Sequence, residues 1–155
     1  MRRFYQKMEK DVIISIRGMQ DFEGVGNDAI ELVTEGRLRQ EGEAGFLLTY
    51  AESELTGLDG TTTTFQIDQD KVTLMRTGEV NSQMVFEEGK RHLSLYETPY
   101  GALTVGVNTR RMNLNLDAAG GDIEIDYAIE IDHTVAGENL FRINVREQKR
   151  PAIKQ

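Results

Sequence analysis

Glu52 and Arg76 are the two residues of this sequence best placed to do chemistry. Glu52 continues the phase of Tyr50 in "GFLLTYAES", and Arg76 continues the phase of Leu74 in "KVTLMRTG". Side chains two residues apart on a strand point to the same face, so an acid and a base would both point inward. A buried charge is costly unless it is paired, and these two could pair with each other. The alternative is that both lie at a strand end in water.

Two tyrosines share inward phases with aliphatic neighbours. Tyr50 lies in the same alternating run as Glu52, and Tyr127 lies in "GGDIEIDYAIEID". A buried tyrosine hydroxyl normally finds a hydrogen-bond partner, which could be a ligand in a small cavity or the surrounding core. We therefore take Tyr50, Glu52, Arg76 and Tyr127 as the candidate ligand-binding residues. Arg76 would recognise a carboxylate or phosphate through two parallel hydrogen bonds.

Other reactive groups are few. The sequence has no cysteine and only two histidines, His92 and His133, which give no recognisable spacing for zinc. His92 shares the phase of Ser94, which suggests an outer face. "GVGNDA" at 24–29 has the form of a dinucleotide loop but not the required βαβ context, so a hairpin loop explains it. We predict no catalytic residues, no metal site and no cofactor.

Alternation of apolar and polar residues recurs along the whole chain and is typical of half-buried strands. About ten such segments are joined by short connections rich in Gly, Asp and Asn, which favours an antiparallel meander. A long meander with one buried side can close into a barrel, which removes its exposed edges. "DAIELVTEGRLRQEG" could be a helix, but its β-branched residues and Gly36 favour a strand. The parity break near Asn108 to Arg111 predicts a β-bulge.

Acids and arginines are expected to face each other on the outside of this sheet. Glu124 and Asp126 alternate with the apolar residues of their strand, and Arg142 and Asn144 do so in the next segment of the chain. Antiparallel pairing would set them side by side, with each pair contributing roughly 0.2–1 kcal/mol. We interpret this acidic stripe as a solvated strand face.

Composition bounds the partners. The 155 residues suffice for a single domain, 1–155, and the net charge is −8 with pI ≈ 4.8. Such a chain is a poor candidate for nucleic acid or for an anionic membrane surface, since both need clustered Lys and Arg. No stretch is long enough to be a signal peptide's apolar region or a membrane-spanning helix. A cytoplasmic location is the simplest fit.

The sequence also resembles a known family. "RTG" at 76–78, "QMVF" at 83–86 and "YETPYG" at 96–101 are its most specific pieces, within a similarity that extends from "DVIISIRG" to "FRINV". These resemble the YwiB-like family of small bacterial proteins, a domain family of unknown function. The resemblance implies an all-β fold, a closed antiparallel meander barrel of the lipocalin-like (calycin-like) kind with about eight to ten strands. It carries no catalytic residues over to this chain.

Three functions follow as hypotheses. The first is a non-enzymatic binding module for a small anionic or amphipathic ligand at the barrel mouth. The alternative is a protein–protein interaction or structural module with a filled barrel and no ligand, which could act as a homodimer. The third is an enzyme that uses Glu52 as a general base. Barrels of about eight strands can either fill with side chains or hold one small ligand. Whether the interior is filled therefore distinguishes the ligand-binding hypothesis from the interaction-module hypothesis.

Overall fold

The chain forms ten strands and one short 3₁₀ helix in a computed structural model that describes residues 9–22, 26–79, 81–98 and 100–148. The predicted all-β fold with about ten strands is confirmed. The elements are β1 (Glu9–Phe22), β2 (Gly26–Glu41), β3 (Gly45–Ala51), η1 (Glu54–Thr56), β4 (Thr61–Ile67), β5 (Lys71–Gly78), β6 (Ser82–Glu87), β7 (Arg91–Thr98), β8 (Gly101–Asp117), β9 (Gly120–Ile131) and β10 (Thr134–Glu147).

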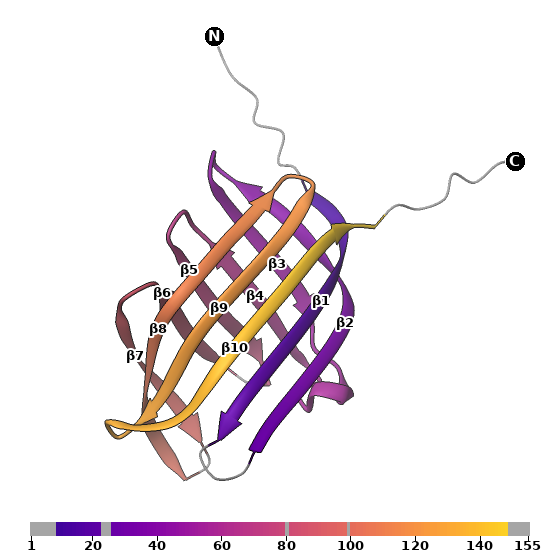
Figure 1. Cartoon of the computed structure of the whole chain (residues 1–155). Helices are drawn as coiled ribbons and strands as arrows, with labels where there is room; N and C mark the ends of the chain where they lie inside the picture. Colours follow the sequence, from indigo (N-terminus) through magenta and orange to yellow (C-terminus); the bar gives the residue numbers. More distant parts are fainter. Residues whose placement is uncertain (1–8, 23–25, 80, 99, 149–155) are drawn as a thin grey trace, which may run out of the picture.

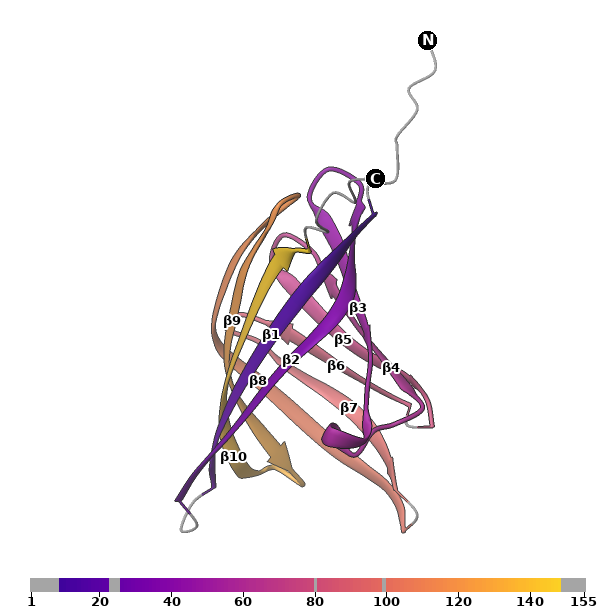
Figure 2. The same cartoon turned by 90° about the vertical axis from the view of Figure 1, so that its right-hand side faces the viewer.

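All ten strands belong to one antiparallel sheet with the order β6-β5-β4-β3-β2-β1-β10-β9-β8-β7. The first and last strands pair in the middle of this order, and every other pair consists of consecutive strands. The sheet curls into a barrel, as Figures 1 and 2 show. Its two ends meet at the turn between β6 and β7, where the Gly89 amide donates to the Thr109 carbonyl of β8 at 2.8 Å. The barrel predicted from sequence is therefore confirmed.

The core follows from the two-residue repeat of the strands. Inward positions carry large apolar residues and are almost fully buried, whereas their neighbours face solvent. Phe65 lies at the centre of the core and contacts the rings of Tyr50 and Phe141, with centroids 6.4 and 5.9 Å away. The largest fully buried side chains are Phe65, Phe86, Ile14, Leu38, Leu48, Ile123, Ile125, Ile143, Val12, Val72 and Val107.

Two details of the sequence reading concern strand geometry. The segment "DAIELVTEGRLRQEG" is strand as far as Glu41, because it lies within β2 up to that residue and mostly pairs with β1. The predicted bulge is also present: the register of β8 against β9 shifts between Thr109 and Arg111. The extra residue changes the parity of β8, so that Thr109 points inward before the bulge and Met112 packs against the core after it.

Phe65→Ala tests the central role of this ring. Because Phe65 is completely buried, we expect the variant to lose roughly 3–5 kcal/mol of unfolding free energy, measured by denaturant titration. Leu93→Ala is the control, since Leu93 is an exposed strand residue and its truncation should change stability by less than about 0.5 kcal/mol. Equal losses in the two variants would contradict this packing.

Candidate functional site

A row of polar side chains crosses the inside of the barrel where β3, β4 and β5 run side by side. The register places Tyr50 opposite Thr63 and Thr63 opposite Arg76. Directly opposed residues share a face, and Tyr50 and Thr63 are buried, so the row points inward. Two of the predicted site residues, Tyr50 and Arg76, are thus brought together with a threonine that the sequence reading had not assigned to the site.

Glu52 completes this cluster just after the end of β3. Its side chain is only 2% exposed, and that of Arg76 is 21% exposed. The carboxylate accepts a hydrogen bond from the Thr63 hydroxyl and one from Tyr50. The Arg76 Nε lies 3.8 Å from the Glu52 Oε2 atom, which makes an ion pair but is too long for a hydrogen bond. A buried acid is therefore balanced by one cation and two hydroxyl donors.

Tyr127 lies in a second polar row on the other wall of the barrel. It stands opposite Thr109 on β8 and opposite Asn139 on β10, and all three residues are buried. Its ring packs edge-on against Phe86 with centroids 4.8 Å apart. The fourth predicted site residue is therefore inside the same barrel, where the positive charge of Arg76 acts to lower its pKa.

Burial dominates the acid–base properties of both tyrosines. It raises the pKa of Tyr127 to about 12, against a smaller opposing effect of the positive charge of Arg76. The pKa of the Tyr50 hydroxyl is raised even more, first by burial and then by the negative charge of Glu52. Both hydroxyls therefore remain protonated at neutral pH and can donate hydrogen bonds inside the barrel.

Two buried polar atoms of this region have no hydrogen-bond partner among the described residues. They are the Nε of Arg76 and the hydroxyl oxygen of Thr109, one on each wall. Buried polar groups in folded proteins are almost always hydrogen-bonded, because an unpaired one costs about 1–3 kcal/mol. These two atoms therefore mark positions where a further polar group would be stabilised.

The end of the barrel next to this cluster has an apolar lining. Ile30 on β2, Leu103 on β8 and Ile131 on β9 are exposed there, although each lies on the inward phase of its strand. Gly18 on β1 also lies on the inward phase, opposite Phe141, and a Cβ added there would meet nothing within 4 Å. Figure 2 shows β1, β2, β7 and β8 running past the short strands at this end. The open space at Gly18 and these exposed apolar side chains thus lie at the same end of the barrel as the polar cluster.

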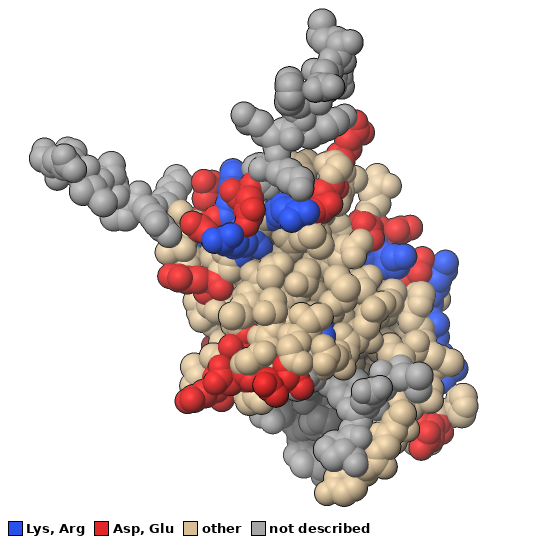
Figure 3. Space-filling model, turned by 180° about the vertical axis from the view of Figure 1, so that it is seen from behind, with Lys and Arg blue, Asp and Glu red and all other residues tan. Residues whose placement is uncertain are grey.

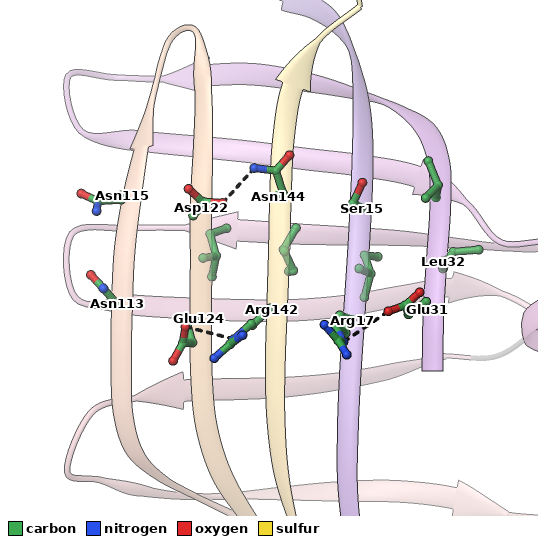
Figure 4. A pocket seen from close by; sticks show the side chains of 14 residues that line it. Ser15, Arg17, Glu31, Leu32, Asn113, Asn115, Asp122, Glu124, Arg142 and Asn144 are labelled. Atoms are coloured by element: carbon green, nitrogen blue, oxygen red, sulfur yellow. Dashed lines mark hydrogen bonds and ion pairs between the residues drawn. The ribbon is translucent and has the colours of Figure 1, made fainter. Parts of the chain in front are cut away.

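A separate hollow of about 620 Å³ lies on the outside, over β8, β9, β10, β1 and β2 (Figure 4). Its charged side chains pair across neighbouring strands: Arg142 with Glu124 at 3.2 Å and Arg17 with Glu31 at 3.3 Å. The predicted pairing of acids with arginines across these strands is confirmed for Glu124 and Arg142. Because these charges already satisfy one another, we do not take this hollow as the candidate site.

The histidines do not form a metal site. Within the part of the chain that the structure describes, no group of three His, Cys, Asp or Glu residues could hold a metal ion. His92 lies 3.0 Å from Glu87, and His133 lies 3.2 Å from Arg91. The prediction that His92 faces outward was wrong. Strand β7 sets His92 opposite Val107, which is fully buried, so both residues lie on the inward face of the sheet.

Residues 14–143 match the family described as Domain of unknown function (DUF1934), and the chain belongs to that family. The fold is similar to that of the ywiB protein from Bacillus subtilis, known from a crystal structure, with a TM-score of 0.79. The two are 21% identical, and the match covers 91% of this chain and 94% of that one, so the likeness concerns the fold. No curated protein matches the sequence. Among the described residues, no helix is long and apolar enough to cross a membrane.

The tyrosines give a pH prediction. An unfolded tyrosine ionises near pH 10, whereas Tyr127 does so only near pH 12 in the folded chain. The unfolded state then binds fewer protons than the folded state, so we expect unfolding free energy to fall between these pH values. Tyr127→Phe should make that decline shallower, measured by denaturant titration at each pH. Tyr100→Phe, which removes a fully exposed hydroxyl, is the control; the same slope in both variants would contradict the burial of Tyr127.

Proposed function

We propose that this chain is a non-enzymatic binding protein for a small amphipathic molecule with one acid group. The acid group binds to Arg76 inside the barrel, and the apolar part lies along the open end. The observation that carries the proposal is the buried Arg76 Nε with no hydrogen-bond partner among the described residues. A ligand oxygen at that position would remove the penalty of the unpaired donor.

The chemistry of Arg76 supports an acidic ligand group. A guanidinium has five donors in a planar fork, and Glu52 holds Arg76 by a contact too long for a hydrogen bond. Donors therefore remain for a carboxylate, a phosphate or another acid group that presents two oxygens to the guanidinium. The protonated Tyr127 hydroxyl, together with the Thr109 hydroxyl that has no partner among the described residues, offers further polar contacts on the opposite wall.

The open end supports an apolar ligand body. Ile30, Leu103 and Ile131 expose apolar surface on the inward side, next to the empty space at Gly18. Ligand pockets are typically lined by apolar residues with a few polar groups that fix orientation. The hypothesis that Glu52 acts as a general base is weaker, because its carboxylate is already engaged by Thr63, Tyr50 and Arg76.

Two dyes test the proposal. Anilinonaphthalene sulfonate is an anionic amphiphile, and N-phenylnaphthylamine has a similar ring system without the acid. We expect both to bind the wild-type chain in a fluorescence titration. Arg76→Met should weaken binding of the sulfonate dye by about tenfold or more, because a charge-assisted hydrogen bond contributes about 1.5–3 kcal/mol. The neutral dye should bind the variant as it binds wild type.

Two further variants keep this test interpretable. Arg37→Met removes an exposed cation of β2 and should leave the affinity for both dyes unchanged. Glu52→Gln removes the anion that competes for Arg76 and should increase the affinity for the sulfonate dye. Thermal unfolding of each variant checks that the barrel is intact. An Arg76→Met protein that stays folded and binds the sulfonate like wild type would overturn the proposal, as would a wild-type chain that binds neither dye.

A further inference from the structure

The outer face of β3, β4, β5 and β6 carries no charged side chain in its central part. Figure 3 shows this face as a broad, almost uncharged area with the acids and bases gathered around its borders. The register defines two rows of outward residues across the four strands. One row is Leu47, Gln66, Thr73 and Val85, and the other is Thr49, Thr64, Met75 and Gln83; together they are called the neutral face.

This absence of charge is unusual for this chain. Charged residues make up 28% of the sequence, and the outer face on the opposite wall carries ion pairs such as Arg142–Glu124 and Arg17–Glu31. Depletion of charged residues, more than hydrophobicity, distinguishes the centre of protein–protein interfaces from the rest of a surface. Solubility alone gives no reason to leave one side of an acidic barrel neutral.

We propose that the neutral face is the interface of a two-fold dimer formed with a second copy of this chain. Each copy carries a net charge of −8, so two copies repel each other wherever acidic surfaces meet. The neutral face allows close approach without setting like charges together. A partner of opposite charge would instead be attracted to the acidic surface, which lies elsewhere.

The neutral face is also complementary to itself. A two-fold axis that runs along the strands between β4 and β5 sets β3 of one copy over β6 of the other. The rows then place Leu47 over Val85 of the second copy, and Thr49 over Gln83 of the second copy. Three of the four pairs match in polarity, including Gln66 over Thr73 of the second copy, and the fourth pair sets Thr64 over Met75 of the second copy.

The size of the neutral face indicates a weak, reversible dimer. The two rows span about four residues along each of the four strands, which at about 4.8 Å between strands and about 3.4 Å per residue gives a flat footprint of roughly 260 Å² on each copy. Twice that area lies below the 1,200 Å² or more that stable specific complexes bury and within the range of transient ones. The dimer should therefore form only at high protein concentration.

Sedimentation equilibrium from about 1 µM to about 1 mM protein tests this directly. We expect a monomer–dimer equilibrium whose dissociation constant falls several-fold when salt rises from about 0.1 M to about 1 M, because screening removes the repulsion between the acidic copies. An interface held by ion pairs would weaken instead. A chain that stays monomeric over the whole range would overturn the proposal.

Substitutions locate the interface. Thr64 and Met75 are cross-strand neighbours at the centre of the neutral face, and we expect Thr64→Glu to weaken dimerisation at least tenfold. Ser15→Glu adds the same charge on the outside of β1, beside Arg17, and should leave the dimer nearly unchanged. Thr64→Val removes a hydroxyl without adding charge and should retain it. A dimer that is weakened by Ser15→Glu and not by Thr64→Glu would place the interface elsewhere and refute the proposal.

Discussion

Both the interior and the outer surface of the barrel depend on one constraint: side chains alternate in direction every residue along a strand. The register of the ten paired strands fixes this alternation. On β5, the same repeat turns Arg76 toward Glu52 and turns Met75 out to the neutral face. A slip of one residue would expose the arginine and bury the methionine. The same register therefore determines both which residues form the interior site and which form the neutral face.

The polar cluster is tolerated inside the barrel because its members satisfy one another in part. Removing either Glu52 or Arg76 alone would leave a poorly compensated charge, which is more costly than losing both. Thr63 and Tyr50 lower that cost by donating to the carboxylate. The cluster also lies at the ends of β3 and β5, where one side of Arg76 reaches solvent. Because the cluster lies between the core and the open end, Arg76 is only partly desolvated and can still be reached from solvent.

Much of this architecture could be predicted from the sequence, because alternation reports the direction of a side chain without reference to its neighbours. The inward direction of Tyr50, Glu52, Arg76 and Tyr127 and the bulge in β8 all follow from parity. His92 shows where this reasoning fails: its run has polar residues on one phase and leucines on the other, yet pairing with Val107 turns the polar phase inward. The direction of such a strand is set by its partner, which the sequence of the strand does not contain.

The parts of the site that the sequence did not reveal depend on distances between strands. Thr63 and Thr109 have inward phases in the sequence, but a threonine there is ordinary for a strand. Only the register shows that Thr63 lies between Tyr50 and Arg76, and only the packed barrel shows that the Thr109 hydroxyl has no hydrogen-bond partner among the residues that the structure describes. The open space at Gly18 is of the same kind, since a glycine in a strand reveals nothing about what it faces.

The two walls of the barrel differ in how they use charge. The long strands β1, β8, β9 and β10 carry their ionic side chains outward, where cross-strand pairs such as Arg142 with Glu124 satisfy them in water. The short strands β3, β4 and β5 carry Arg76 inward, beside Glu52, and are uncharged outside except for Lys71 at the start of β5. Charge that stabilised the sheet alone would be placed in solvent on every strand, because desolvating it is costly. Its placement inside one wall and its absence from the centre of that wall's outer face are therefore not explained by the stability of the sheet alone.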